Sequence, residues 1–258
     1  MHNYALEQLL PANVFALLLV ASRIAGAITF LPGFGDAYVP VRVRVVLAFM
    51  ITFVVTPILA DHLPAEPKDI AALSALIITE AFIGSFIGLV ARVLLASLET
   101  AGAVIATQSS LASAITFDPG SQRNETLPAS LMGALALVLI FALNIHHMLL
   151  TGLVDSYQVF PAGEVPPLDD MSHAMIRLVA QGFVISLEIA APYMILGTLF
   201  YLSLGLVGRI MPQLQIFYIG LPLQIMGGLT MLMITISAAV LWFLGTFEEV
   251  LRNFTGML

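Results

Sequence analysis

The sequence contains no cysteine and few charged side chains among its 258 residues. Without cysteine, the chain cannot form disulfides, bind a metal through thiolates or use a cysteine nucleophile. Only 10% of the residues are Asp, Glu, Lys or Arg, which is too few to cover a soluble globule of this size. Residues 130–145 and 229–245 contain no charge at all. These absences exclude an ordinary soluble protein and indicate a membrane-type chain.

Basic residues are scarce as well. Lys and Arg number 9 against 16 Asp and Glu, the formal net charge is −7, and the pI is about 5.0. This balance argues against nucleic-acid binding and against docking on anionic lipid through a basic patch. Apolar residues, in contrast, make up 60% of the chain, and the mean hydropathy is +1.02. We therefore expect partners to meet this chain mainly through apolar contacts.

The apolar residues gather into six long stretches. Those at 175–207 and 214–247 exceed the roughly 20 residues that a bilayer span requires, and Pro192 and Pro222 provide one kink point in each. We expect an all-α, polytopic membrane-type protein of about six kinked helices. The six stretches are residues 14–31, 45–60, 70–98, 127–150, 175–207 and 214–247.

Five ionisable residues lie inside these stretches or at their ends. A charged side chain that faces lipid at mid-depth costs about 3 kcal/mol, so all five are expected to be buried charges that face protein or water. One interpretation is a proton or ion relay, and the other is pairing with neighbouring helices, in this chain or in another. Pairing is favoured because two of the five are arginines, which are poor proton carriers. The five are Arg23, Glu80, Arg92, Glu99 and Glu188.

No residue pattern points to catalysis or to a metal site. His146 and His147 are neighbours at a helix end, where their side chains diverge by about 100° and seldom bind one metal. Ser109, Ser110 and Ser113 stand in no strained nucleophile turn of the Gly-x-Ser-x-Gly type. The sequence therefore predicts no enzyme activity, no catalytic residue, no metal site and no cofactor.

Four stretches carry a family resemblance. Residues 23–49, 118–131, 141–163 and 208–228 read RIAGAITFLPGFGDAYVPVRVRVVLAF, DPGSQRNETLPASL, FALNIHHMLLTGLVDSYQVFPAG and GRIMPQLQIFYIGLPLQIMGG. In order and spacing they resemble the FliR family of flagellar biosynthetic proteins, over nearly the whole chain. The resemblance implies a subunit of the flagellar type III export apparatus, present once per assembly, in the bacterial inner membrane at the flagellar basal body. Virulence-secretion counterparts share the fold, so the sequence leaves the class of exported protein open.

The C-terminal part carries a second likeness. Residues 190–225 are similar to the helical hairpin of the small companion protein FliQ. The resemblance implies a FliP-like helical region at 1–170 and a FliQ-like helical hairpin at 171–258, working with FliP, FliQ, FlhB and FlhA. Part of the apolar surface is then buried by partner subunits instead of lipid. The hairpin tip is expected at Arg209, Pro212, Gln213 and Gln215.

A polar but uncharged stretch follows the third apolar segment. In the FliR family the corresponding loop lies across the pore lumen, so the resemblance implies a pore-plug loop near residues 106–120. Small, uncharged residues suit a seal that excludes ions yet yields to a polypeptide. Family members often show Gln-x-Gly with an aromatic residue soon after, whereas Ser110 and Ser113 occupy those places here. The predicted plug residues are Gln108, Ser109, Ser110, Leu111, Ala112, Ser113, Ala114, Ile115, Thr116 and Phe117.

Two functional hypotheses from different classes follow. The favoured one is a non-enzymatic subunit that forms, with FliP and FliQ, the export pore for unfolded flagellar polypeptides and contributes its plug loop. The alternative is a stand-alone ion-coupled membrane transporter or channel, which should be stable without those partners.

Overall fold

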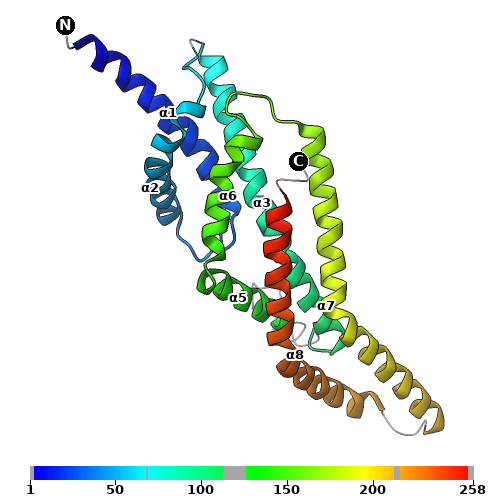
Figure 1. Ribbon diagram of the computed structural model, residues 1–258. Helices are drawn as coiled ribbons and strands as arrows, with labels where there is room; N and C mark the ends of the chain where they lie inside the picture. The colour runs from blue at the N-terminus through cyan, green and yellow to red at the C-terminus, as the bar shows by residue number, and fades with distance from the viewer. Residues whose placement is uncertain (1–2, 68, 113–125, 212–215, 255–258) are drawn as a thin grey trace. The chain divides into compact units, whose positions relative to one another are not determined.

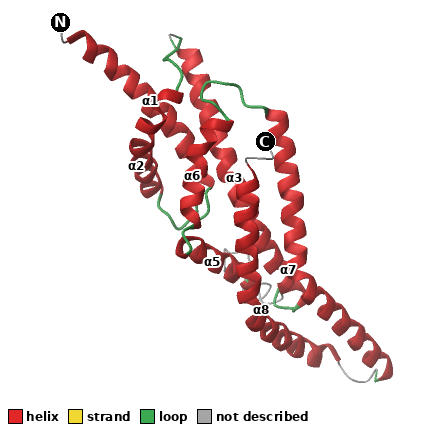
Figure 2. Ribbon diagram, in the orientation of Figure 1, coloured by secondary structure: helices red, strands yellow, loops and turns green. Residues whose placement is uncertain are grey.

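The computed structural model describes residues 3–67, 69–112, 126–211 and 216–254, and these residues form helices and connecting loops with no strand (Figures 1 and 2). The all-α membrane-type class expected from the sequence is confirmed. The described elements are α1 (Asn3–Phe30), α2 (Val41–Leu59), the 3-10 helix η1 (Ala60–His62), α3 (Ile70–Gln108), α5 (Leu127–Ala142), α6 (Ile145–Val159), α7 (Leu168–Ile210) and α8 (Ile216–Phe254).

Two of the differences between the helices and the six apolar stretches concern the middle of the chain. The stretch at 127–150 contains a break between α5 and α6, where Asn144 adopts a left-handed backbone with φ 61°. Asn tolerates this conformation better than most residues, which explains how a helix ends here without glycine or proline. The third stretch continues ten residues further than its apolar composition suggested, to the end of α3 at Gln108.

Four helices are long and apolar enough to cross a membrane: α2, α3, α7 and most of α8. The pair α5 and α6 together forms a further, broken candidate. Within the candidate windows of the four helices only 17–28% of the residues are buried. Most of their apolar surface therefore remains available to lipid or to other subunits.

The chain divides into two compact units. The first contains Met1–Val93, Leu143–Ile176 and Leu251–Leu258, and the second contains Leu94–Ala142 and Arg177–Val250. α3, α7 and α8 each contribute to both units. The two units are defined by contacts within the chain. The FliP-like region at 1–170 and the FliQ-like region at 171–258 were inferred from the family resemblance instead, and they stay a prediction.

The first unit is organised by a close approach between α1 and α3. A Cβ added to Gly84 would lie 1.9 Å from the Arg23 carbonyl oxygen, and one added to Gly88 would lie 2.4 Å from the Ala27 carbonyl oxygen. From the other side, a Cβ on Gly26 would lie 2.4 Å from the carbonyl oxygen of Ala81. Only glycine fits at these three points, as is common where membrane helices pack backbone to backbone.

The second unit contains the remainder of α3 with α5, α7 and α8. α3 meets α5 closely, because a Cβ on Gly102 would lie 2.5 Å from the Ala129 Cα. α3 also meets α7, where the Ser186 hydroxyl donates to the Ser97 carbonyl at 2.7 Å. Both α7 and α8 contain an internal proline, and both bend along their length (Figure 1). The core of this unit therefore lies along the last four turns of α3, whose end begins the predicted plug.

Candidate functional site

The predicted plug stretch begins where α3 ends, in the second unit. The Ser109 amide and hydroxyl both donate to the Ile105 carbonyl, at 2.9 and 2.7 Å. Ser110 then adopts φ 58°, the left-handed conformation that glycine usually supplies at a helix C-terminus. A non-glycine residue pays about 1 kcal/mol or more for this geometry. Ser110 thus adopts, with a side chain, a backbone conformation that glycine would adopt at lower cost.

Two helices hold the end of α3. Gln224 of α8 donates from Nε2 to the Gln108 carbonyl oxygen at 2.7 Å, which satisfies a carbonyl that a helix end leaves without an intrahelical donor. A Cβ added to Gly197 of α7 would lie 2.5 Å from Gln108 Oε1, and one added to Gly228 of α8 would lie 2.2 Å from Ser109 Cβ. A larger residue at Gly228 would displace Ser109, and one at Gly197 would push aside the side-chain amide of Gln108. We call Gln108, Ser109, Gly197, Gln224 and Gly228 the loop anchor.

The loop anchor lies beside two cavities with uncharged walls. One, of about 210 Å³, is lined by the anchor residues and by apolar side chains of α7 and α8. The other, of about 480 Å³, is lined by Ser110, Tyr201 and Gln224 among others. The Tyr201 hydroxyl shares hydrogen bonds with the side chains of Ser110 and Gln224. Every described residue that lines either cavity is neutral, so the start of the plug stretch is held by contacts that need no ion pair.

The structure describes the first half of the predicted plug. Gln108 and Ser109 belong to the loop anchor, Ser110 turns the chain out of the helix, and Leu111 is buried. The Ala112 amide donates back to the Ala106 carbonyl at 3.1 Å. The remaining predicted residues lie outside the described part of the chain, and sealing by them stays a prediction. They are Ser113, Ala114, Ile115, Thr116 and Phe117.

Arg23 and Glu80 form a buried ion pair in the first unit. Their side chains are 0% and 1% exposed. Arg23 donates from Nε to Glu80 Oε2 at 2.6 Å and from Nη2 to Glu80 Oε1 at 3.0 Å, which is the bidentate geometry that guanidinium and carboxylate groups favour. α1 and α3 are thereby joined at mid-helix, next to the close contact at Gly84.

Residues of α6 and the turn after it complete the surroundings of the guanidinium. Arg23 Nη1 donates to the Ser156 hydroxyl at 3.2 Å and Nη2 donates to the Phe160 carbonyl at 2.9 Å. The Arg23 Cζ lies 3.7 Å from the centre of the Tyr157 ring, a cation–π contact. The Arg23 charge is therefore balanced by one carboxylate and surrounded by hydrogen-bond acceptors and an aromatic face. This favours structural pairing over a proton relay.

Arg92 pairs with Asp36, which lies in the loop between α1 and α2. The Gly33 amide and the Tyr38 hydroxyl also donate to Asp36 Oδ2, at 2.7 and 2.9 Å. Burial by itself raises the pKa of Asp36, but these hydrogen bonds and the Arg92 charge outweigh it and lower the pKa overall. Burial and the hydrogen bond to Asp36 raise the pKa of Tyr38 to about 12. Because the Arg92 side chain is 41% exposed, this pair lies at the protein's edge and not in its core.

The other two predicted buried charges lie in the second unit. Glu99 of α3 is half-buried, and a Cβ on Gly133 of α5 would lie 3.2 Å from its Oε1. Glu188 of α7 is exposed and lines a cavity of about 270 Å³. Within this chain, burial thus describes Arg23 and Glu80, whereas Arg92, Glu99 and Glu188 are partly or fully exposed. Arg92 has its partner Asp36 within the chain, and the prediction that charges of this group pair with another subunit stays a prediction.

The predicted hairpin tip lies between α7 and α8. Arg209 is exposed in the last turn of α7, where a cation suits the negative end of the helix dipole. Pro212, Gln213 and Gln215 lie outside the described residues. α7 ends at Ile210 and α8 begins at Ile216, so all three fall between the two helices.

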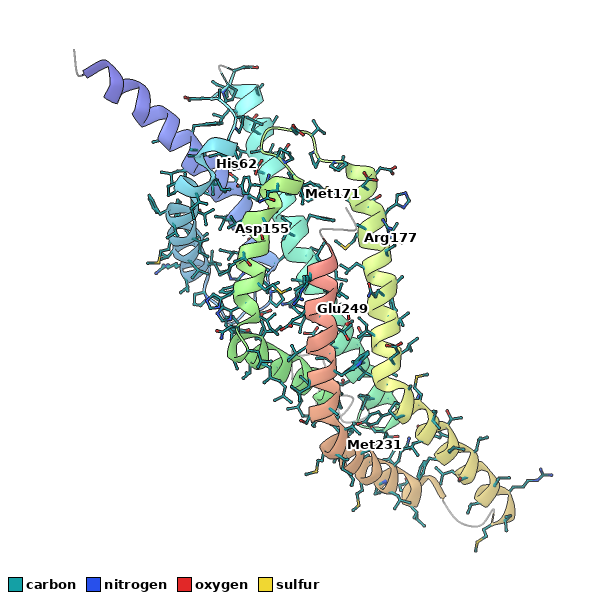
Figure 3. The ribbon with its side chains drawn as sticks, viewed as in Figure 1. His62, Asp155, Met171, Arg177, Met231 and Glu249 are labelled. Atoms are coloured by element: carbon teal, nitrogen blue, oxygen red, sulfur yellow. The ribbon has the colours of Figure 1, made fainter. Side chains whose placement is uncertain are left out.

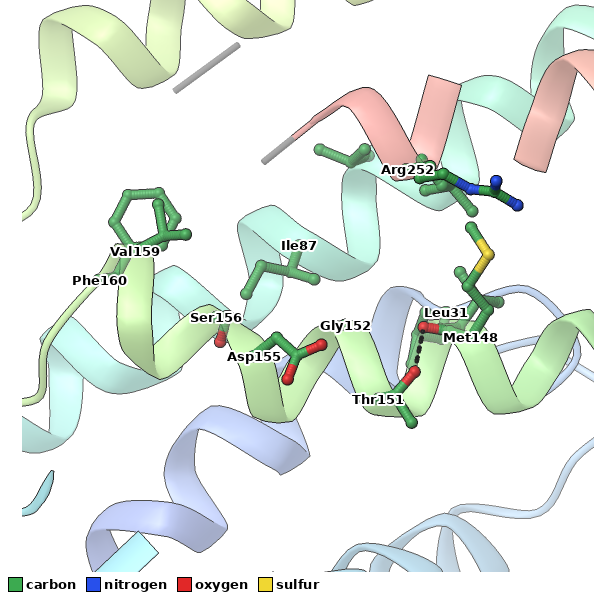
Figure 4. A pocket seen from close by; sticks show the side chains of 13 residues that line it. Leu31, Ile87, Met148, Thr151, Gly152, Asp155, Ser156, Val159, Phe160 and Arg252 are labelled. Carbon is green, nitrogen blue, oxygen red and sulfur yellow. Dashed lines mark hydrogen bonds between the residues drawn. The ribbon is translucent and has the colours of Figure 1, made fainter. Parts of the chain in front are cut away.

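The first unit also contains an apolar cavity of about 360 Å³ beside α6 (Figure 4). Asp155 and Arg252 line it together with hydrophobic side chains. The Thr151 hydroxyl donates to the Met148 carbonyl at 3.1 Å, and the Ser156 hydroxyl donates to the Leu153 carbonyl at 2.6 Å. No histidine is among the described residues that line the cavity, and Asp155 is the one carboxylate among them. Across the described residues, no group of three or more His, Asp or Glu is placed to hold a metal ion.

The sequence analysis did not identify the residues that hold the Arg23 side chain and the end of α3. Ser156 lies 133 residues from Arg23 in the chain, and Gln224 lies 116 residues from Gln108, so no local pattern links either pair. Asp36 was not distinguished from other loop acids. One signal was available, because GSFIG at residues 84–88 places two glycines four apart in an apolar helix. That spacing is typical of close helix packing in membranes.

Comparisons with known proteins agree with this architecture. The family described as bacterial export proteins, family 1, matches residues 14–250. The chain is 32% identical over 243 residues to the flagellar biosynthetic protein FliR of Caulobacter vibrioides, covering 94% of this chain and 97% of that protein. It is 33% identical to FliR of Escherichia coli, covering 81% and 80%, and 29% identical to FliR of Bacillus subtilis, covering 92% and 93%. The chain therefore belongs to the FliR family of bacterial export proteins, a family of flagellar biosynthesis.

Proposed function

We propose that this chain is a non-enzymatic subunit of the flagellar type III export gate, and that it forms the export pore with FliP and FliQ. In this proposal the loop that starts at the loop anchor plugs the pore, and unfolded flagellar polypeptides displace it during export. The observation that carries the proposal is the loop anchor itself. Here α3 turns sharply at Ser110 and is fastened to α7 and α8 by a neutral hydrogen bond and two glycine contacts.

Such an anchor suits a gate. A plug must return to the same place after each opening, so its base has to be fixed while its contacts remain weak enough to exchange. Tight packing at Gly197 and Gly228 fixes the base. The hydrogen bonds from Gln224 and around Tyr201 are neutral, and a neutral hydrogen bond contributes only about 1 kcal/mol. None of the described anchor residues is charged, so the base of the proposed plug presents no charge to the pore.

The apolar surface of α7 and α8 supports a role inside an assembly. Several large hydrophobic side chains near the predicted hairpin tip are each at least 61% exposed, and patches of this extent mark lipid or protein contacts. We propose that FliP and FliQ cover much of this surface, with FlhB and FlhA close by, and that the chain is present once per assembly in the inner membrane at the basal body. The side chains are Leu202, Leu206, Ile210, Tyr218, Ile219, Leu223 and Met226.

Co-purification tests the proposal. The chain is produced with and without FliP and FliQ, extracted in mild detergent and analysed by size-exclusion chromatography. We expect one defined complex that contains all three proteins, and an aggregated or poorly stable chain when the partners are omitted. A stable, monodisperse monomer or homo-oligomer that does not bind FliP and FliQ would instead support a stand-alone transporter or channel.

A further inference from the structure

Glu188 of α7 presents a carboxylate that has no partner among the residues that the structure describes. It forms no hydrogen bond or ion pair with any residue that the structure describes, and it lines the cavity of about 270 Å³ in the second unit. Its neighbours Val184 and Leu187 are exposed apolar side chains. A carboxylate in the middle of such a surface is costly against lipid. A donor, a cation or water must therefore reach it from beyond the described residues.

The cavity offers more acceptors than the carboxylate alone. Pro192 lies four residues after Glu188 in the same helix and has no N–H, so the Glu188 carbonyl oxygen lacks its usual helical donor. Both residues line the cavity. The Tyr193 and Thr235 hydroxyls, which are hydrogen-bonded to each other, line it as well. Trp242 of α8 adds an exposed aromatic ring to the wall.

The same set of groups already holds an arginine elsewhere in this protein. Arg23 is bound by the Glu80 carboxylate, by the Phe160 backbone carbonyl, by the Ser156 hydroxyl and by the face of Tyr157. The Glu188 cavity presents a carboxylate, a carbonyl without its helical donor, hydroxyls and an indole ring, but no described arginine or lysine lines it.

We propose that this cavity receives an arginine side chain from another subunit of the export assembly. The inference rests on the proposed function and deepens it, because it assigns one contact of the partner surface. Arginine fits better than lysine, since a planar guanidinium binds a carboxylate through two parallel hydrogen bonds, has further N–H donors for carbonyl and hydroxyl acceptors, and stacks on aromatic rings such as that of Trp242, which lines the same cavity. A cavity of about 270 Å³ is several times the roughly 30 Å³ of a water molecule, which leaves room for a long side chain.

The first test replaces Glu188 by glutamine in the chain co-produced with tagged FliP and FliQ. The matched control is Glu249→Gln on α8, an exposed glutamate (Figure 3) that does not line the cavity. We expect Glu188→Gln to lower the amount of co-purified chain by at least about tenfold, because a partner arginine is left buried without its counter-charge. Glu249→Gln should co-purify at the wild-type level.

The second test identifies the partner by charge exchange. Glu188→Arg is combined in turn with replacement of each arginine of FliP, FliQ and FlhB by glutamate, and one combination should restore assembly. Wild-type co-purification in the same experiment reports on the proposed function independently. If the wild-type chain assembles but Glu188→Gln assembles equally well, or if no arginine replacement restores Glu188→Arg, the arginine contact is refuted while the gate assignment stands. Restoration by replacing a lysine instead would also overturn the assignment to arginine.

Discussion

Replacing Glu80 by alanine would leave the Arg23 guanidinium buried at 0% exposure without its counter-charge. The change removes the two hydrogen bonds of 2.6 and 3.0 Å, while the contacts to Ser156, Phe160 and Tyr157 remain. Breaking a buried ion pair on one side typically costs about 3–5 kcal/mol, a large share of the roughly 5–15 kcal/mol that stabilises a domain. At about 2–4 °C per kcal/mol for a chain of this length, the thermal midpoint should fall by roughly 10 °C.

The assay is thermal unfolding of the detergent-solubilised complex of the chain with FliP and FliQ, with the wild-type complex as the reference. Glu249→Ala, a change at an exposed site, serves as the control and should shift the free energy of unfolding by no more than about 0.5 kcal/mol. The double variant Arg23→Met with Glu80→Met should be less destabilised than Glu80→Ala, because it removes both charges and retains apolar packing. The reasoning is refuted if Glu80→Ala melts at the wild-type temperature. It is also refuted if the double variant melts at a lower temperature than Glu80→Ala.

The remaining predictions concern the loop anchor and the first loop. Ser110→Gly relieves the strain at φ 58°, by about 1 kcal/mol, but loses the hydrogen bond to Tyr201, also about 1 kcal/mol, so it should melt above Ser110→Ala, which loses the bond and keeps the strain; equal midpoints of the two variants would contradict this. Gly228→Val should destabilise the protein by displacing Ser109, whereas Gly227→Val, where an added Cβ meets nothing within 4 Å, should be tolerated in the same melting assay. The folded-state pKa of Asp36 is lowered from 3.8, so its stabilisation is present above that value and is lost as the pH falls through the folded pKa. The loss of stability between pH 7 and pH 3 should therefore be smaller in Asp36→Asn, and an equal loss would show that Asp36 does not contribute.

Much of the architecture could be predicted because it follows from composition. Apolar runs with almost no charge specify helices in a membrane-type chain, and the high cost of an unpaired charge predicted that Arg23 and Glu80 would be paired or hydrated. That reasoning concerns each residue by itself. It could show that Arg23 needs a partner but not which partner, since Glu80 lies 57 residues away on another helix.

The remaining features depend on tertiary packing or on single backbone angles. Nothing in the sequence distinguishes Asn144, where the helix breaks, from other polar residues at helix ends. The left-handed backbone at Ser110 could not be predicted either, because serine seldom adopts that conformation. The position of Gln224 against Gln108 depends on how α3 and α8 pack. The family resemblance predicted which residues form a plug, but the geometry at the end of α3 came only from the structure.

The most direct test of the account is membrane permeability after deletion of residues 112–117, with the loop anchor left intact. Loop length affects closure free energy only weakly, so the shortened chain should still co-purify with FliP and FliQ. Cells that produce the three proteins should then take up small solutes and lose membrane potential faster than cells with the intact chain, whereas cells that produce the shortened chain without FliP and FliQ should not. Full assembly with a membrane as tight as that of the intact complex would contradict the central claim that this loop seals an export pore.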